Sequence, residues 1–309
     1  MKLLRLLVLL AISPLLAVAA QAKTTYVEGH DGVPLAVTVV GPEEGPEILF
    51  LHGIGMGADS FNPQLQSELA HKYRMVAFDL RGHGMSGKPS DPEAYTQREV
   101  WAGDVERVIA ATGLKRPVIV AWSYGTLVTS DYLLAHGTDG ISGLVLVSAL
   151  GGLVVPVPSD TPPDPEVMAQ MAKYYKLRAS VSLADQEQSV DILAPLLYEQ
   201  TEDGPSKEWR DRARLLGLIV PPYAQAPLRS HPSDNGELVE QLAETPVLVV
   251  HGIKDFAVNP VDAANLKSLL PQTQIVAVDP GGHSPFAERP DLFNQTISAF
   301  VDQAWSIDE

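Results

Sequence analysis

The most constraining feature of the chain is an apolar, strand-like run that stops abruptly at a serine. Val118, Ile119 and Val120 are β-branched, as is typical of strands, and Ser123 follows within the string AWSYG at residues 121–125. A segment with helix-forming and small residues begins at once. This order predicts a tight strand–turn–helix that projects the serine hydroxyl above a sheet. A serine between small residues is more often an ordinary turn, so the prediction depends on the rest of the chain.

The chain alternates strands with helices in two separate stretches. Apolar runs that predict strands buried on both faces lie at 47–51, 75–80, 118–122, 141–147, 246–250 and 274–278. Helical patterns are expected at 59–73, 99–112, 124–136, 261–270 and 290–305. Before them, His30-Asp31-Gly32 between two short strand-like runs predicts a hairpin. Alternating strands and helices indicate an α/β fold, with a mostly parallel sheet and helices on both faces.

Residues 151–244 interrupt this alternation. A proline-rich stretch leads into helical segments expected at about 166–179, 183–200 and 206–219. Because so long a connection is unusual as a loop, we interpret it as a helical lid, or cap, inserted into one core domain formed by residues 23–150 and 245–309. We expect most of its large apolar side chains to pack its own helices, and a few to favour a substrate with an apolar acyl or alcohol group. These side chains are Met168, Met171, Tyr174, Tyr175, Leu193, Leu196, Leu197 and Trp209.

The first 22 residues differ in kind from the rest. Lys2 and Arg5 precede an apolar run at 6–20, and residues 20–22 form an A-x-A cleavage site. This pattern predicts a secretory signal peptide, residues 1–22. The run has 15 residues, fewer than the ~18 wanted for a membrane span, so removal is favoured over a retained anchor. We therefore expect an exported, periplasmic or secreted protein with no membrane span after signal removal.

Composition limits the partners and the kinds of site. The formal charge is −16, and removal of Lys2 and Arg5 takes it to −18, which argues against nucleic acid or anionic lipid. The absence of cysteine excludes a disulfide, a thiolate metal site and a catalytic thiol. The histidines are scattered, and no phosphate-binding Gly-x-Gly-x-x-Gly follows the first buried strand. We expect no cofactor, no metal, and a small-molecule substrate.

Two further turns follow strands at the edge where Ser123 is expected. Asp255 ends the string HGIKD after one strand, and His283 lies in GGHSP after the last. The carboxyl ends of parallel strands share one edge, so the three side chains should meet there, in the chain order Ser, Asp, His. A serine hydroxyl needs a base to take its proton, and a carboxylate orients that base. The candidate catalytic residues are therefore Ser123 as nucleophile, His283 as base and Asp255 as acid.

Such chemistry also needs backbone donors for the developing oxyanion. One is expected from the residue after the nucleophile, Tyr124, and the other from the glycine-rich loop HGIG at residues 52–55, where Ile54 is the candidate. The other polar residues near these turns are expected to be structural. His52 and His251 would shape their loops, and Asp104 would face outward or cap a local interaction. The string DLRGHGMSG at 79–87 would form a braced turn.

With these strings in place, the chain resembles the α/β-hydrolase fold superfamily, in its haloperoxidase- or perhydrolase-like and esterase-like branch. The strings are HGIG, DLRGHGMSG, AWSYG, HGIKD and GGHSPFAERP, and the resemblance covers residues 24–305 apart from the lid. Ala121 replaces the usual first glycine of the serine motif, a mild departure. Ser123 stands where dehalogenases and epoxide hydrolases of this fold carry aspartate, so those activities are disfavoured. The resemblance implies the same roles for Ser123, Asp255 and His283.

Three functions remain open. The leading hypothesis is a carboxylic ester hydrolase acting through an acyl-enzyme, with peracid formation as a plausible side reaction. The second is an aminopeptidase similar to prolyl iminopeptidases, which would need lid acids for the substrate amine and usually a further proline after Ile54. The lid acids available are Glu166, Asp185, Glu187 and Asp191. The third is a non-catalytic binding protein on a hydrolase scaffold.

Overall fold

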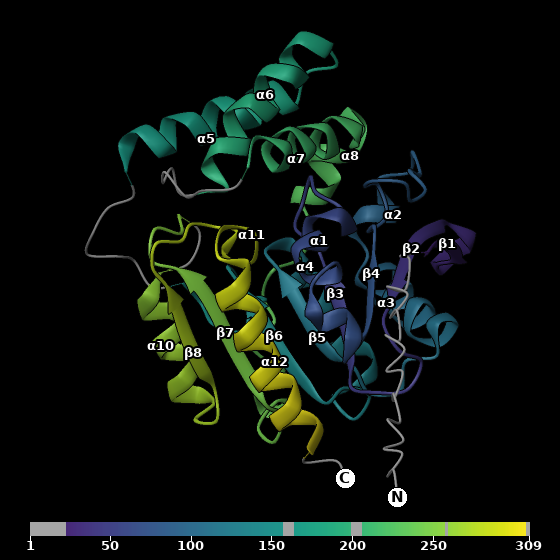
Figure 1. Cartoon of the computed structure of the whole chain (residues 1–309). Coiled ribbons are helices and arrows are strands. Elements are labelled where there is room, and N and C mark those ends of the chain that lie inside the picture. Colours follow the sequence, from purple (N-terminus) through teal and green to yellow (C-terminus); the bar gives the residue numbers. More distant parts are fainter. Residues whose placement is uncertain (1–22, 157–163, 199–205, 257–258, 307–309) are drawn as a thin grey trace, which may run out of the picture.

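The computed structural model describes residues 23–156, 164–198, 206–256 and 259–306. Their strands form one sheet in the order β1-β2-β4-β3-β5-β6-β7-β8 (Figure 1). β2 pairs antiparallel with both β1 and β4, and all other neighbours are parallel. The strands are β1 (Lys23–Glu28), β2 (Pro34–Val40), β3 (Glu47–Leu51), β4 (Arg74–Phe78), β5 (Val118–Trp122), β6 (Gly143–Val147), β7 (Val247–Gly252) and β8 (Gln274–Val278). The predicted α/β class with a mostly parallel sheet is confirmed.

Helices cover both faces of this sheet, and successive strand residues serve two different cores. In β3, Leu49 and Leu51 join a core with α3, α4 and α10, whereas Ile48 and Phe50 join one with α1, α11 and α12. Figure 1 shows α12 crossing the near face. Because both faces are buried, the central strands are apolar at nearly every position. The helices are α1 (Asn62–Leu65), α2 (Glu93–Thr96), α3 (Arg98–Thr112), α4 (Tyr124–His136), α10 (Pro260–Leu269), α11 (Pro285–Glu288) and α12 (Pro290–Ser306).

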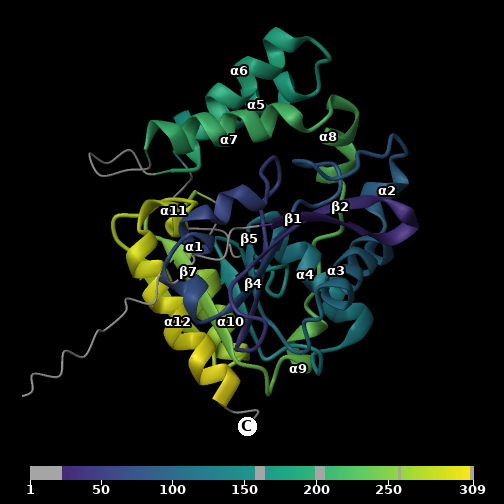
Figure 2. The same ribbon diagram turned by 45° about the vertical axis from the view of Figure 1, so that its right-hand side comes forward.

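Five helices lie between β6 and β7 in the described part of the chain. They are α5 (Pro165–Arg178), α6 (Leu183–Leu196), α7 (Lys207–Ile219), α8 (Pro222–Arg229) and α9 (Leu238–Gln241). Figures 1 and 2 show α5 to α8 as a layer above the sheet. α9 lies at the bottom of the view in Figure 2 and contacts α4. Leu238 and Leu242 are fully buried in the core that contains α4. The segment predicted as a lid thus has two parts, a covering layer and a returning end that packs on the core.

One helix expected from the sequence differs from the structure. The prediction of a single helix at 59–73 is wrong. The chain instead forms a 3₁₀ helix at Ala58–Phe61, the short α1, and another 3₁₀ helix at Glu68–His71. The hydroxyl of Ser67 donates to Gln64 O (2.7 Å) and accepts from Leu69 N (3.2 Å), so it competes with continuous helical bonding. α8 begins at Pro222, a position where the missing N–H costs nothing.

None of the helices in the described residues combines the length and the apolar character needed to cross a membrane. The predicted signal peptide, residues 1–22, lies outside the described residues.

Candidate active site

Ser123 occupies the tight turn between β5 and α4 that the sequence predicts. Its backbone has φ 52° and ψ −117°, a conformation that costs a non-glycine residue about 1–3 kcal/mol. The turn is fixed on both sides, because Ser123 N donates to Val147 O (3.0 Å) and Thr126 N donates to Ser123 O (3.0 Å). A Cβ on Gly125 would lie 2.5 Å from Leu51 O, so this position requires glycine. The surrounding structure thus holds the serine in its strained, projecting orientation.

His283 lies between Ser123 and Asp255. Its Nε2 is 3.0 Å from Ser123 Oγ, and its Nδ1 is 2.8 Å from Asp255 Oδ1. The side chains of His283 and Asp255 are 4% and 0% exposed. A carboxylate beside Nδ1 fixes the tautomer with the proton there, which leaves Nε2 free to accept the serine proton. The structure therefore brings together the three side chains predicted from the turns after β5, β7 and β8.

The loop that carries His283 is held from the core. Trp122 Nε1 donates to His283 O (2.7 Å), and Gly282 N donates to the carboxylate of Glu288 (2.8 Å). A Cβ on Gly252 would lie 2.1 Å from Gly281 O, so the turns after β7 and β8 are packed backbone against backbone. This close packing sets the separation between Asp255 and His283.

The two predicted oxyanion donors also lie beside Ser123. Tyr124 is the first residue of α4, so its N–H has no acceptor within the helix. Ile54 lies in the loop after β3 and lines the same two cavities as Ser123. A Cβ on Gly53 would come within 3.1 Å of Ser123 Cβ, so only glycine there permits this approach without displacement. Both N–H groups thus belong to segments that border the serine.

Buried polar residues brace the loop that contains Ile54. His52 Nε2 accepts from Leu80 N (2.9 Å), and Asp79 accepts from Ala58 N and Met85 N (both 2.7 Å). The ring of His83 packs edge-on against that of His52, 5.1 Å between centroids. Burial lowers the pKa of His52 to about 4 and that of His83 to about 3, so both rings are neutral near pH 7. The structural roles predicted for this group of residues agree with these contacts.

Two other polar residues from the sequence analysis have structural contacts. Asp104 does not face outward as one expectation had it; it is fully buried, paired with Arg81 (2.6 Å) and accepts from His30 N (2.8 Å). The second expectation for Asp104, a cap on a local interaction, describes the His30 contact. His251 is buried, with Nδ1 3.2 Å from Gly252 O.

Two cavities meet at Ser123. The smaller, about 220 Å³, extends under the lid beside Phe256, and the larger, about 550 Å³, extends toward the loop after β6. Ile54, Ser123, Tyr175 and Arg229 line both cavities. Among the predicted lid side chains, Met171, Tyr174, Tyr175, Leu193 and Leu197 line the smaller cavity, whereas Met168 is 54% exposed. An ester bond at Ser123 would therefore have space on each side.

The lid acids lie away from these cavities. Within the described ranges, Glu166, Glu187 and Asp191 are exposed, Asp185 is half-buried, and none of the four lines either cavity. Asp191 forms an ion pair with Arg214. No cluster of three or more histidine, aspartate or glutamate side chains suited to a metal ion occurs in the part of the chain that the structure describes.

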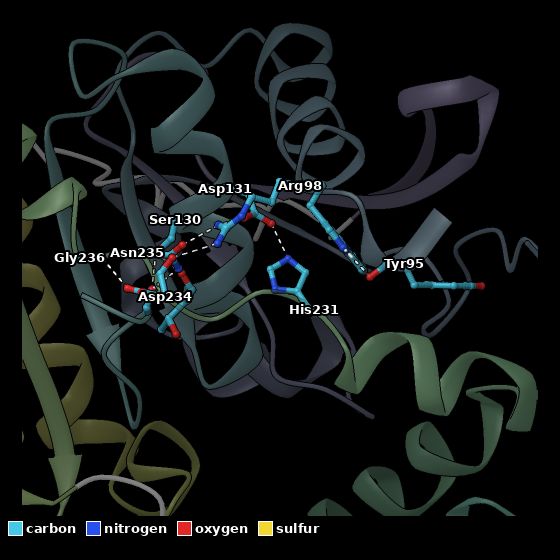
Figure 3. Close-up of polar contacts among 11 residues, drawn as sticks. Tyr95, Arg98, Ser130, Asp131, His231, Asp234, Asn235 and Gly236 are labelled. Carbon is cyan, nitrogen blue, oxygen red and sulfur yellow. Dashed lines mark hydrogen bonds and ion pairs between the residues drawn. The ribbon is translucent and has the colours of Figure 1, made fainter. Parts of the chain in front are cut away.

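A second histidine–aspartate pair was missed by the sequence analysis. His231 Nε2 lies 2.5 Å from Asp131 Oδ2, and Arg98 Nη1 lies 2.7 Å from Asp131 Oδ1 and 2.5 Å from Asn235 Oδ1 (Figure 3). His231 is 7% exposed and lines the larger cavity. Its partners lie at least 100 residues away along the chain, and no motif surrounds it. No local signal would have revealed this pair.

Comparisons with known proteins agree with this geometry. Residues 46–290 match the family model described as alpha/beta hydrolase fold. The chain is similar to a non-heme chloroperoxidase from Streptomyces lividans (27% identity, 88% of this chain and 97% of the relative). It also resembles a bifunctional esterase/perhydrolase from Acinetobacter calcoaceticus (25% identity, 89% and 99%). A solved structure of a putative aryl esterase from Burkholderia cenocepacia superposes with TM-score 0.80 (31% identity, 92% and 100%).

Proposed function

Because the chain belongs to the alpha/beta hydrolase fold family and is an esterase-like hydrolase, we propose that it cleaves carboxylic esters through an acyl-enzyme on Ser123. The observation that carries this proposal is the continuous chain of contacts from Ser123 Oγ to His283 Nε2 (3.0 Å) and from His283 Nδ1 to Asp255 Oδ1 (2.8 Å). Neutral imidazole accepts the serine proton, and the carboxylate stabilises the imidazolium that forms.

The proposed reaction has two halves. Ser123 Oγ attacks the ester carbonyl carbon while its proton moves to His283 Nε2, and the carbonyl electrons move onto oxygen. The N–H groups of Ile54 and Tyr124 stabilise that oxyanion. Its collapse breaks the bond to the alcohol oxygen, which leaves with the proton from His283. Water then attacks the acyl group by the same route, with His283 taking its proton and returning one to Ser123.

The lid contacts favour this reaction over the aminopeptidase alternative. An aminopeptidase of the predicted kind needs a carboxylate near Ser123 for the substrate amine, and the four lid acids lie outside both cavities. A non-catalytic binding protein would have no need of the strained serine and its two hydrogen-bonded partners.

We propose peracid formation as a second activity of the same site. The observation behind it is the similarity to relatives named non-heme chloroperoxidase and bifunctional esterase/perhydrolase. Hydrogen peroxide would replace water as the nucleophile toward the acyl-enzyme, which gives the peracid and free Ser123.

We also propose that the protein is exported, periplasmic or secreted, with the signal peptide removed after residue 22. The support is the sequence pattern of the first 22 residues, with Lys2 and Arg5 before the apolar run. The expected mature protein begins at Lys23. Mass spectrometry of the protein recovered outside the cytoplasm tests this, and recovery of only the uncleaved chain in the membrane fraction would contradict it.

Labelling with a fluorophosphonate probe tests the nucleophile. The unmodified protein should be labelled on Ser123 and should hydrolyse short nitrophenyl esters but not proline anilides. Ser123→Ala should lose both labelling and ester hydrolysis. Labelling that persists in Ser123→Ala would refute the assignment, anilide hydrolysis would favour the aminopeptidase, and inertness to every substrate would favour a binding protein.

A further inference from the structure

We propose that the active-site cleft selects esters that carry a carboxylate, and that Arg229 binds this carboxylate. The inference rests on the proposed esterase function, since it assigns a substrate class to the same site. Arg229 is the last residue of α8 and lines both cavities that meet at Ser123. The two cavities share a border formed by Ile54 and Ser123 on the core side, and by Tyr175 and Arg229 on the lid side.

Arg229 has no carboxylate partner among the residues that the structure describes. Its guanidinium lies over the ring of Tyr175, 5.4 Å from the centroid, and makes one long hydrogen bond to Gln225 Oε1 (3.4 Å). Stacking on an aromatic ring leaves the edges of the guanidinium, with their N–H donors, available. Those donors match a carboxylate in geometry, and charge-assisted bonds of this kind are among the strongest in proteins.

A second arginine of the lid, Arg178, interacts electrostatically with Arg229 and likewise has no carboxylate partner in the described part of the chain. Arg178 is 1% exposed, donates to Gln186 Oε1 (2.5 Å) and Gly217 O (3.0 Å), and its Nε has no partner. Burial lowers the pKa of Arg178, Tyr174 opposes this shift, and the charge of Arg229 acts in the same direction as burial. The two arginines thus interact electrostatically, and none of the hydrogen bonds that either makes among the described residues goes to a carboxylate. An anionic ligand at Arg229 would relieve this repulsion.

The second histidine–aspartate pair fixes the chain just after Arg229. His231, two residues after Arg229, is fixed to Asp131, and Arg98 links that carboxylate to Asn235 (Figure 3). Asn235 Nδ2 in turn donates to Gly151 O (2.6 Å) in the loop after β6. The end of α8 is thus tied to the core, so little ordering is needed when a ligand binds.

The residues that line the cleft limit where the substrate carboxylate can bind. The smaller cavity has an apolar lining that includes Leu193, Leu197 and Phe256, which suits the uncharged part of a substrate. The larger cavity is lined in part by the buried Asp262, whose carboxylate disfavours an anion beside it. The carboxylate is therefore placed at the border, next to the ester bond. Half-esters of dicarboxylic acids meet this description, as do esters whose alcohol or phenol part carries a carboxylate.

Matched substrate pairs test the proposal. For a charge on the acyl side the pair is monomethyl adipate against methyl hexanoate, and for a charge on the other side it is 4-acetoxybenzoate against its methyl ester. In one of the pairs, Arg229→Gln should hydrolyse the anionic member with a kcat/KM about 10- to 100-fold below that of the unmodified protein. A loss of this size is expected when a charged hydrogen bond is removed. The neutral member should change less than about threefold. Arg229→Lys should recover part of the loss.

Arg214→Gln is the matched control, because Arg214 is an exposed lid arginine paired with Asp191 outside the cleft. It should leave the ratio of anionic to neutral turnover unchanged. An equal loss for both members in Arg229→Gln, or no loss for either, would overturn the charge assignment while the esterase proposal stands. If the unmodified protein hydrolyses no ester and resists the fluorophosphonate, the proposed function fails instead.

Discussion

The described residues contain two buried histidine–aspartate pairs, which differ mainly in what else the aspartate and the histidine touch. Asp255 and His283 lie 2.8 Å apart, and the far nitrogen of the ring contacts Ser123 Oγ. Asp131 and His231 lie 2.5 Å apart, but this carboxylate is also paired with Arg98, and His231 Nδ1 has no hydrogen-bond partner. The first pair ends at a hydroxyl on a strained turn, and the second ends at a cation. A histidine–aspartate pair therefore indicates catalysis only together with the group at its other end.

The origin of the two pairs differs as well. Asp255 and His283 follow the carboxyl ends of β7 and β8, where parallel strands gather side chains at one edge. Asp131 lies within α4, and His231 follows α8 in the returning part of the lid. The second pair joins helix to loop and ties the lid to the core.

The largest expected difference between the pairs is in activity. His283→Gln should lower kcat toward a nitrophenyl ester by about 10⁶, since loss of the base removes the means to activate the serine. His231→Gln should change it by less than about tenfold, because this ring contacts no reacting atom. Steady-state kinetics on both purified variants make the comparison. Equal losses would show that the second pair also takes part in the reaction.

For stability, the second pair should matter more than the catalytic pair when the aspartates are replaced. Asp131→Asn removes the partner of both Arg98 and His231, and should lower the free energy of unfolding by about 3 kcal/mol, reduced from the fully buried case because the Arg98 side chain is 27% exposed. Asp255→Asn should lower kcat by about 10⁴, as the wrong tautomer is then favoured.

Urea unfolding followed by circular dichroism gives the stabilities for that comparison. Asp255→Asn is expected to unfold within about 1 kcal/mol of the unmodified protein, because its effect is on the tautomer and not on a charged network. If Asp131→Asn proves the more stable of the two, the network around Arg98 does not tie the lid to the core.

A smaller effect concerns the dependence of stability on pH, and it comes from the buried His52 and His83. In the folded protein, burial keeps the pKa of these rings at about 4 and about 3. The unfolded chain takes up protons below the ordinary value of about 6.5. The unfolded state therefore binds more protons between pH 6.5 and 4, and the free energy of unfolding falls with decreasing pH, by up to about 1.4 kcal/mol per pH unit for each ring.

Urea unfolding at several pH values measures this slope. His83→Asn keeps a donor for Arg81 O, the present partner of His83 Nδ1 at 2.9 Å, and should remove one ring's share of the slope. His71→Asn replaces an exposed ring and serves as the control that should leave the slope unchanged. A slope in His83→Asn equal to that of the unmodified protein would mean that His83 is protonated in the fold or does not gain a proton on unfolding.

The sequence by itself determined the elements whose cause is local. The alternation of apolar runs with helical patterns fixed the parallel sheet, because strands buried on both faces must be apolar at each position. The turn at Ser123 follows from a β-branched run, a serine and Gly125 in order, and the strand order places Asp255 and His283 at the same edge. These features need only short-range patterns and the rule that parallel strands share their carboxyl ends.

Only the tertiary structure decided the contacts that join distant segments. Ser67 divides the predicted helix at 59–73 by hydrogen bonds that a helical pattern does not reveal. Asp131 meets His231 across 100 residues, and Arg229 of the lid lines the same cavities as Ser123. Such contacts arise from how the lid packs back on the core, and packing leaves no period or motif in the sequence. The position of Arg229 at the border between the two cavities could therefore be found only from the folded structure.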